Sequence, residues 1–263
     1  MSRLMWDADG ARLYESGVNQ VALFPKTGAN GAYGTGVAWN GVTSISETPS
    51  GGEPTALYAD NTKYLTLMSV EELGGTIEAY MHPDEFAACD GSASLETGVV
   101  IGQQTRKEFG LAYKTAIGND VDGTDHGYKL HLIYNAMAKP SEHQYSTIND
   151  SPEAATMSWE YSTTPVQIDG YKPASRILVI STKATGAKMK VLEDIIYGIP
   201  TPEFNAASTY AVGDYVTYTD KVYKCKTAVT APGAWSAASW TEVPNPGPRM
   251  PMPSEVISLM SAT

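Results

Sequence analysis

Apolar and polar residues alternate through residues 99–138, the stretch around which we interpret the rest of the chain. The positions that share one face in each run are Phe109, Leu111, Tyr113, Thr115 and Ile117, then Tyr128, Leu130, Leu132, Tyr134 and Ala136. Successive side chains of a β-strand point to opposite faces, so each run predicts a strand. Residues 119–127 between them are rich in Asn, Asp and Gly and predict a turn. We therefore expect a long antiparallel hairpin with one face on a core and the other in water.

Weaker patterns predict the elements around this hairpin. Extended segments are expected at residues 12–24, 42–47, 56–64, 65–70, 76–81 and 156–163. Residues 174–182 form an aliphatic run that is typical of a central buried strand. Short helices are expected at residues 83–88, 188–197 and 253–260, and Gly198 stands where a helix commonly ends.

Residues 26–41 are rich in glycine and interrupt this pattern. The spacing of Gly31, Gly34 and Gly36 differs from that of a dinucleotide-binding loop, and no helix pattern follows it. A phosphate cradle needs the N-terminus of a helix as well as the glycines. We therefore expect a mobile loop, of a length that suits a contact arm between subunits.

Together these patterns predict a mainly β protein, with an antiparallel β-sandwich or barrel and one or two flanking helices. Only 18% of the residues are charged, and this composition favours strands and loops over helical bundles. The amino-acid composition changes after residue 200, because residues 201–243 are rich in Tyr, Val, Thr and Trp. We expect a domain at 1–200, a small all-β module at 201–243 and a further segment at 244–263.

Net charge, the cysteines and the N-terminal residues indicate which partners and which cellular compartment to expect. The net charge of −11 and the pI near 4.8 disfavour tight binding to nucleic-acid phosphates, although DNA could slide past an acidic wall. Cys89 and Cys225 fall in different predicted domains, which favours two reduced thiols over a disulfide. Residues 1–7 contain no apolar stretch of a signal peptide, so we expect folding in a cytosol.

Motifs of catalysis and metal binding are missing from the sequence. The four histidines are scattered, and neither a nucleophile elbow nor a phosphate-binding loop occurs. The acidic residues 119–126 invite comparison with a calcium loop, but counted from Asp120 the glycine comes fourth and the twelfth residue is His131. A plain polar turn is the better interpretation. We expect no catalytic residue, no metal, no cofactor and no enzymatic activity.

Long collinear runs resemble the major tail tube proteins of long, non-contractile-tailed bacteriophages. These runs are Trp6-Asp7 and residues 12–18, 33–41, 53–61, 101–106, 119–120, 125–129, 149–154 and 251–257. The resemblance implies a β-sandwich-like tube fold whose hexameric rings stack into a tube in the virion tail. It also implies that residues 244–263 return to the tube domain, so that the module at 201–243 is an insertion. The tube would be the conduit for DNA during ejection. The implied partners are further copies of the chain, the tape measure protein and genomic DNA in the lumen, and the tail terminator and tail-tip proteins.

The inserted module resembles the small chitin- and cellulose-binding modules appended to chitinases. The resemblance rests on Tyr210, Gly213, Asp214, Val216 and Tyr218, then Tyr223-Lys224-Cys225, Trp235 and Trp240. It implies that Trp235 is an exposed sugar platform, because the C–H face of a pyranose packs on an indole. Two residues depart from the family pattern, since Phe204 replaces a usual tryptophan and Val229 a common histidine.

A module of this size needs its large side chains for its own core. We therefore expect Tyr210, Tyr218, Tyr223 and Trp240 to be core residues and Trp235 to be the carbohydrate-binding residue. Two functions follow. The first is a self-assembling tail tube subunit with an external module that binds host-surface polysaccharide. The alternative is a carbohydrate-binding adhesion protein of the tail tip, with the β domain as its carrier.

Overall fold

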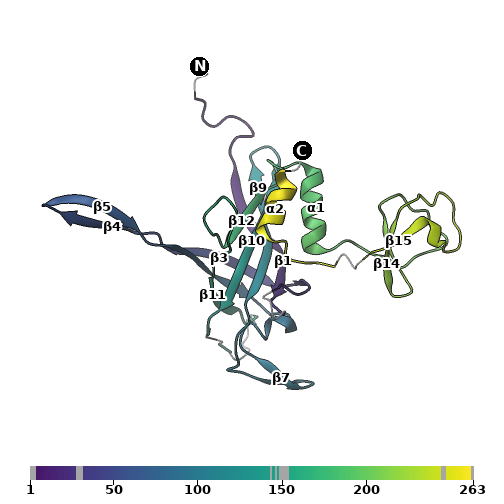
Figure 1. Cartoon of the computed structure of the whole chain (residues 1–263), viewed down its shortest axis with the longest axis horizontal. Coiled ribbons are helices and arrows are strands. Elements are labelled where there is room, and N and C mark those ends of the chain that lie inside the picture. Colours follow the sequence, from purple (N-terminus) through teal and green to yellow (C-terminus); the bar gives the residue numbers. More distant parts are fainter. Residues whose placement is uncertain are drawn as a thin grey trace.

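The computed structural model describes residues 4–27, 32–142, 144–145, 147, 154–243 and 247–261. The fold is mainly β, as predicted, and its largest sheet is antiparallel (Figure 1). The strand order is β2-β1-β9-β10-β11-β6-β3, and β12 also pairs with β10. These strands are β1 (Tyr14–Pro25), β2 (Val37–Ala38), β3 (Val42–Gly51), β6 (Glu71–Ala79), β9 (Phe109–Asn119), β10 (Gly123–Ala138), β11 (Met157–Thr163) and β12 (Arg176–Ile180).

The β9–β10 hairpin lies in the middle of this sheet, and residues 109–113 and 130–134 are buried on both faces. Leu132 pairs with Ala112, and both face the helices α1 (Gly186–Tyr197) and α2 (Pro253–Ser261). The neighbouring pair, Ile133 and Leu111, belongs to a separate core on the opposite face. The expectation that one face lies in water was therefore wrong, because two helices distant in sequence cover it. Both helices were predicted close to their observed bounds.

The second core lies inside the curl of the sheet, where β1 and β3 approach each other. Its centre is aromatic: the ring of Phe86 lies 4.5 Å from that of Trp39 and 5.4 Å from that of Trp159. Phe86 comes from a single 3-10 turn, Asp84–Phe86, where a short helix was predicted at residues 83–88. The shorter element suffices to insert this ring.

Trp39 belongs to the glycine-rich segment, and its burial corrects our interpretation of residues 26–41 as a mobile loop. Residues 28–31 lie outside the described residues, but Tyr33 bridges to Lys26, and β2 pairs with β1. A side chain at Gly36 would overlap the ring of Phe24. The described part of the segment is therefore packed on the sheet, and Gly36 permits a close approach rather than motion.

β12 was expected to be a central strand, but it pairs with β10 alone and lies at an edge, where its residues are mostly half-buried. Its alternate residues Ile177 and Val179 contribute to the core on the helix side of the sheet. Cys89 and Cys225 are both buried and free, as predicted. Among the described residues, no helix is long and apolar enough to cross a membrane.

Three folded parts project from this body, in addition to the N-terminal segment (Figure 1). One is a hairpin of β4 (Pro54–Ala59) and β5 (Thr62–Met68), and a second is a hairpin of β7 (Ala93–Glu96) and β8 (Val99–Ile101). The third is the unit that follows α1, which Figure 1 shows beyond the helices on the side opposite the β4–β5 hairpin. This unit contains its own sheet and its own small core.

Candidate functional site

The module is organised by a three-stranded antiparallel sheet in the order β13-β14-β15. The strands are β13 (Tyr215–Tyr218), β14 (Lys221–Cys225) and β15 (Trp240–Glu242), and a 3-10 turn at Ala237–Ser239 precedes the last of them. Thr219 and Asp220 both have positive φ, +48° and +63°, as a tight two-residue hairpin turn requires. Val216, Cys225 and Trp240 are fully buried on one face of this sheet.

Trp235 packs into the aromatic cluster that covers this face. The ring of Tyr218 stacks on it at 4.1 Å with an interplanar angle of 10°, and Trp240 lies parallel to it at 5.1 Å and 14°. Phe204 meets it edge-on at 5.1 Å, and Tyr223 does so at 4.7 Å. Trp235 is nevertheless only half-buried. Its neighbours thus fix the indole in one orientation while part of its surface stays accessible.

The other aromatic residues differ in exposure. Trp240 is 4% exposed, whereas Tyr210, Tyr218 and Tyr223 are half-buried, as Trp235 is. Tyr210 is also held by its hydroxyl, which donates to the Asn205 carbonyl at 3.1 Å and accepts from the Asn205 N–H at 2.7 Å. Within the described chain, the hydroxyls of Tyr218 and Tyr223 have no such partner. Both remain available to a ligand beside Trp235.

A charged pair borders the aromatic cluster. Lys221 is directly opposite Tyr218 in the β13–β14 register, and Glu242 is directly opposite Tyr223 in the β14–β15 register. Their charged groups lie 2.9 Å apart and are exposed. The hydrogen bond that Lys221 donates to Glu242 raises the pKa of Lys221. The sequence motif did not point to these residues, although the alternation along β14 places Lys221 and Tyr223 on one face.

The two residues that depart from the expected pattern have structural roles. Phe204 contacts four aromatic rings of the cluster at 5.1–6.0 Å and lies at its centre. Val229 exchanges two backbone hydrogen bonds with Tyr210, at 2.9 and 3.0 Å. These contacts close the module around its core.

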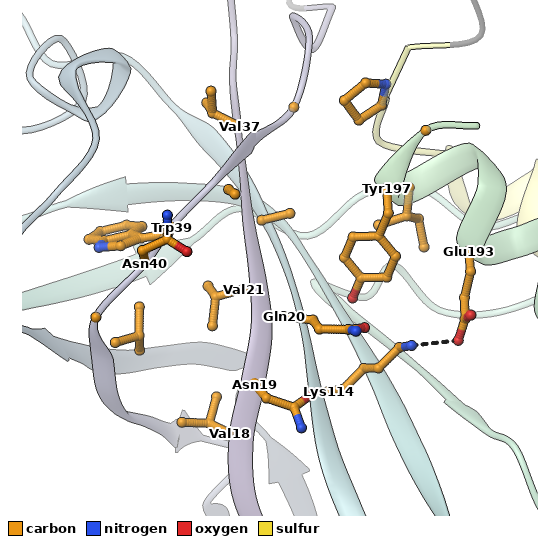
Figure 2. A pocket seen from close by; sticks show the side chains of 18 of the residues that line it. Val18, Asn19, Gln20, Val21, Val37, Trp39, Asn40, Lys114, Glu193 and Tyr197 are labelled. Carbon is orange, nitrogen blue, oxygen red and sulfur yellow. Dashed lines mark ion pairs between the residues drawn. The ribbon is translucent and has the colours of Figure 1, made fainter. Parts of the chain in front are cut away.

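The body contains a cavity of about 650 Å³ between β1, β2 and α1 (Figure 2). Lys114 and Glu193 form an ion pair at 2.6 Å along one side, and the Lys114 ammonium lies 5.3 Å from the centre of the Tyr197 ring. Figure 2 shows the Tyr197 hydroxyl directed toward Gln20 and Lys114. Because Lys114 and Glu193 neutralise each other, we assign them to the packing of α1 on the sheet.

A second charged cluster joins four strands. Glu47 on β3 accepts a hydrogen bond from the Tyr113 hydroxyl at 2.6 Å and pairs with Arg176 on β12, while Nδ1 of His131 lies 3.2 Å away. Burial alone would raise the pKa of Glu47, but hydrogen bonds from His131, Tyr113 and Arg176 outweigh it and lower this pKa to about 2. The cluster is a structural cross-link between β3, β9, β10 and β12.

The acidic turn at residues 119–126 is explained by its own hydrogen bonds. The Asn119 side-chain oxygen accepts from the N–H groups of Val121 and Asp122, which is an Asx turn. Asp122 in turn contacts His126 at 3.1 Å. Over the residues that the structure describes, no group of three or more His, Cys, Asp or Glu side chains is arranged to hold a metal ion.

Comparison with known families finds one match in this chain, to carbohydrate-binding module family 5/12, over residues 203–247. The predicted resemblance of the insert is thereby confirmed. The match covers about a sixth of the chain and does not extend to the body. No curated protein matches the chain. The resemblance of the body to tail tube proteins stays a prediction.

Proposed function

We propose that this protein binds carbohydrate through the module, with Trp235 as the principal contact. The observation that carries the proposal is the family match over residues 203–247, together with a partly exposed indole that its neighbours hold in one orientation. Because Tyr218 and Trp240 both stack on the indole, a sugar ring would pack its C–H face against the exposed part of the Trp235–Tyr218 pair, and preorganised side chains lose little entropy on binding. Tyr218, stacked on the indole, extends the apolar surface beyond a single ring.

Polar groups at the border would orient the sugar. Lys221 and Glu242 offer a donor and an acceptor beside Tyr218 and Tyr223, and both are exposed enough to exchange their mutual contact for sugar hydroxyls. Their charges cancel, which suits a neutral polysaccharide such as chitin or cellulose.

The binding proposal is tested by retention of the full chain on insoluble chitin and cellulose. Trp235→Ala should lower the retained fraction at least tenfold. Tyr215→Ala is the matched control, because Tyr215 lies on the opposite face of the same sheet beside Lys224. Since Trp235 also packs against the core, Trp235→Tyr should keep the fold and part of the binding. Retention of Trp235→Ala equal to that of the parent would overturn the assignment.

We propose further that the body is a self-assembling structural subunit, which stacks as hexameric rings into a phage tail tube and displays the module outside. The support is the collinear resemblance of residues 12–18, 33–41 and 53–61 among others to tail tube proteins. DNA would pass the lumen during ejection, and the tape measure, terminator and tip proteins would be its other partners. Display in many copies would raise the avidity of even a weak sugar site. In this proposal the chain is a virion protein without enzymatic activity.

The alternative is an adhesion protein at the tail tip, with the body as carrier. The two differ in copy number and arrangement. Electron microscopy of the purified protein should show stacked rings if the subunit hypothesis is right. A discrete particle of a few copies, with no stacking at high concentration, would favour the alternative.

A further inference from the structure

The β4–β5 hairpin and its joining residues, 52–70, form an arm with almost no contact to the rest of the chain. Every residue of β5 is exposed, and so is every residue of β4 except Ala56. The arm continues the β3–β6 ribbon, whose last pair is Gly51 with Glu71, and projects away from the body (Figure 1). It therefore cannot fold back on its own domain without breaking that ribbon.

The arm is a well-formed ribbon rather than a loose loop. Its strands pair from Pro54 with Met68 to Ala59 with Thr62. Asp60 and Asn61 at the tip have φ of +50° and +61°, the conformation of a two-residue hairpin turn that matches the twist of its strands. At its base Gly51 has a φ of +77°, and a side chain there would overlap the Val70 carbonyl. The chain thus specifies the shape of the arm at both ends.

One face of the arm is apolar and uncovered. Leu57 pairs with Leu65, and Leu67 lies two residues further along the same face. An isolated two-stranded ribbon is marginally stable in water and needs a further layer against such a face. No other residue that the structure describes supplies that layer, which leaves this face open to a partner molecule.

The apolar surface of the arm is large enough to form an interface. Seven of its side chains, distributed over both faces of the ribbon, are 38–78% exposed and together present on the order of 800 Å². They are Leu57, Tyr58, Tyr64, Leu65, Leu67, Met68 and Val70. A stable interface buries about 800 Å² per partner, whereas the largest apolar patch of a typical monomer is about 300–600 Å².

We propose that the arm docks on the body of a second copy of this chain, an inference that rests on the proposed assembly function. The same body carries further exposed apolar groups on its other projections: Leu4, Met5 and Trp6 near the N-terminus, and Leu95, Val99 and Val100 on β7–β8. One copy thus offers both an arm and apolar surface that another copy can cover. An arm that meets a different surface of its neighbour makes a head-to-tail contact, which generates rings or filaments.

The test compares the full chain with a variant that carries Leu57→Ser and Leu65→Ser. Both side chains lie outside the two cores, so the thermal unfolding midpoint of the body should not change. Sedimentation velocity over a concentration series should show that the variant needs at least tenfold more protein to assemble. Val212→Ser is the control, because Val212 is 64% exposed on the module and should leave assembly unchanged.

The outcomes separate the arm from the assembly proposal. If the parent assembles and the double variant assembles equally well, the arm proposal is overturned and the assembly function stands. If Val212→Ser lowers assembly as much as the double variant does, the effect is not specific to the arm, which also overturns the proposal. A parent that remains monomeric at every concentration would overturn the assembly function itself.

Discussion

The module and the body manage large apolar side chains in opposite ways. In residues 203–243, Val212 is the one exposed large apolar side chain, at 64%, and the aromatic rings of the core contact one another. The body holds two well-packed cores yet leaves apolar groups exposed on its arm, its N-terminal segment and β7–β8. A unit that stands alone in water must cover its apolar surface, whereas a unit that assembles keeps some for its partners. The difference predicts that the module folds and binds by itself and that the body is completed by other copies.

The largest effect should come from breaking the body while sparing the module. Phe86→Ala removes the ring at the centre of the second core, beside Trp39 and Trp159, and should lower the free energy of unfolding by about 3–5 kcal/mol. Calorimetry should show that the body unfolds at a lower temperature than in the parent. Retention on polysaccharide should persist at temperatures above this unfolding transition. Loss of retention together with the body transition would mean that the module depends on the body, and the contrast would fail.

The second-largest effect should come from lowering the pH, which should destabilise the body through Glu47. The folded-state pKa of Glu47 is about 2, against an ordinary value of 4.5, so its ionised form stabilises the body above about pH 4.5. That contribution is lost as the pH falls through 4.5 toward 2 and amounts to at most about 3 kcal/mol. Glu47→Gln should unfold more readily at pH 7 and show a flatter pH dependence than the parent. An unchanged acid slope in this variant would show that Glu47 is not the group responsible.

The smallest effect concerns the two hairpin turns. Asp220→Gly relieves a positive φ in the module and should raise its unfolding free energy by about 0.5–1 kcal/mol. The equivalent Asn61→Gly at the tip of the arm should leave the body transition of the monomer unchanged, because the arm contributes nothing to either core. If Asn61→Gly shifted the body transition as far as Asp220→Gly shifts that of the module, the arm would be part of the cooperative body.

The sequence predicted most strands, because side-chain alternation reports directly which positions share a face. It did not predict what covers each face. Leu130 and Leu132 are buried by helices some sixty and one hundred and twenty residues later, and the pattern within a strand contains no information about them. Glycine content was misleading because it also depends on tertiary contacts. A glycine at position 36 is compatible with a mobile loop and with close packing against Phe24, and the sequence does not distinguish the two.

The candidate site was likewise predicted only in part. The aromatic positions follow from the spacing of Tyr218, Trp235 and Trp240 and its resemblance to a known module. The roles of Lys221 and Glu242 depend on the register of three strands, which the motif does not specify. The arm was predicted as extended chain, but its isolation from the body is a property of the tertiary fold alone.

The contrast between the two units is tested most directly by amide hydrogen exchange on the full chain, as dilute monomer and after assembly. The account predicts that assembly slows exchange at residues 52–70 and leaves exchange at residues 203–243 unchanged. Equal exchange of the arm in both states, or protection of the module on assembly, would contradict it.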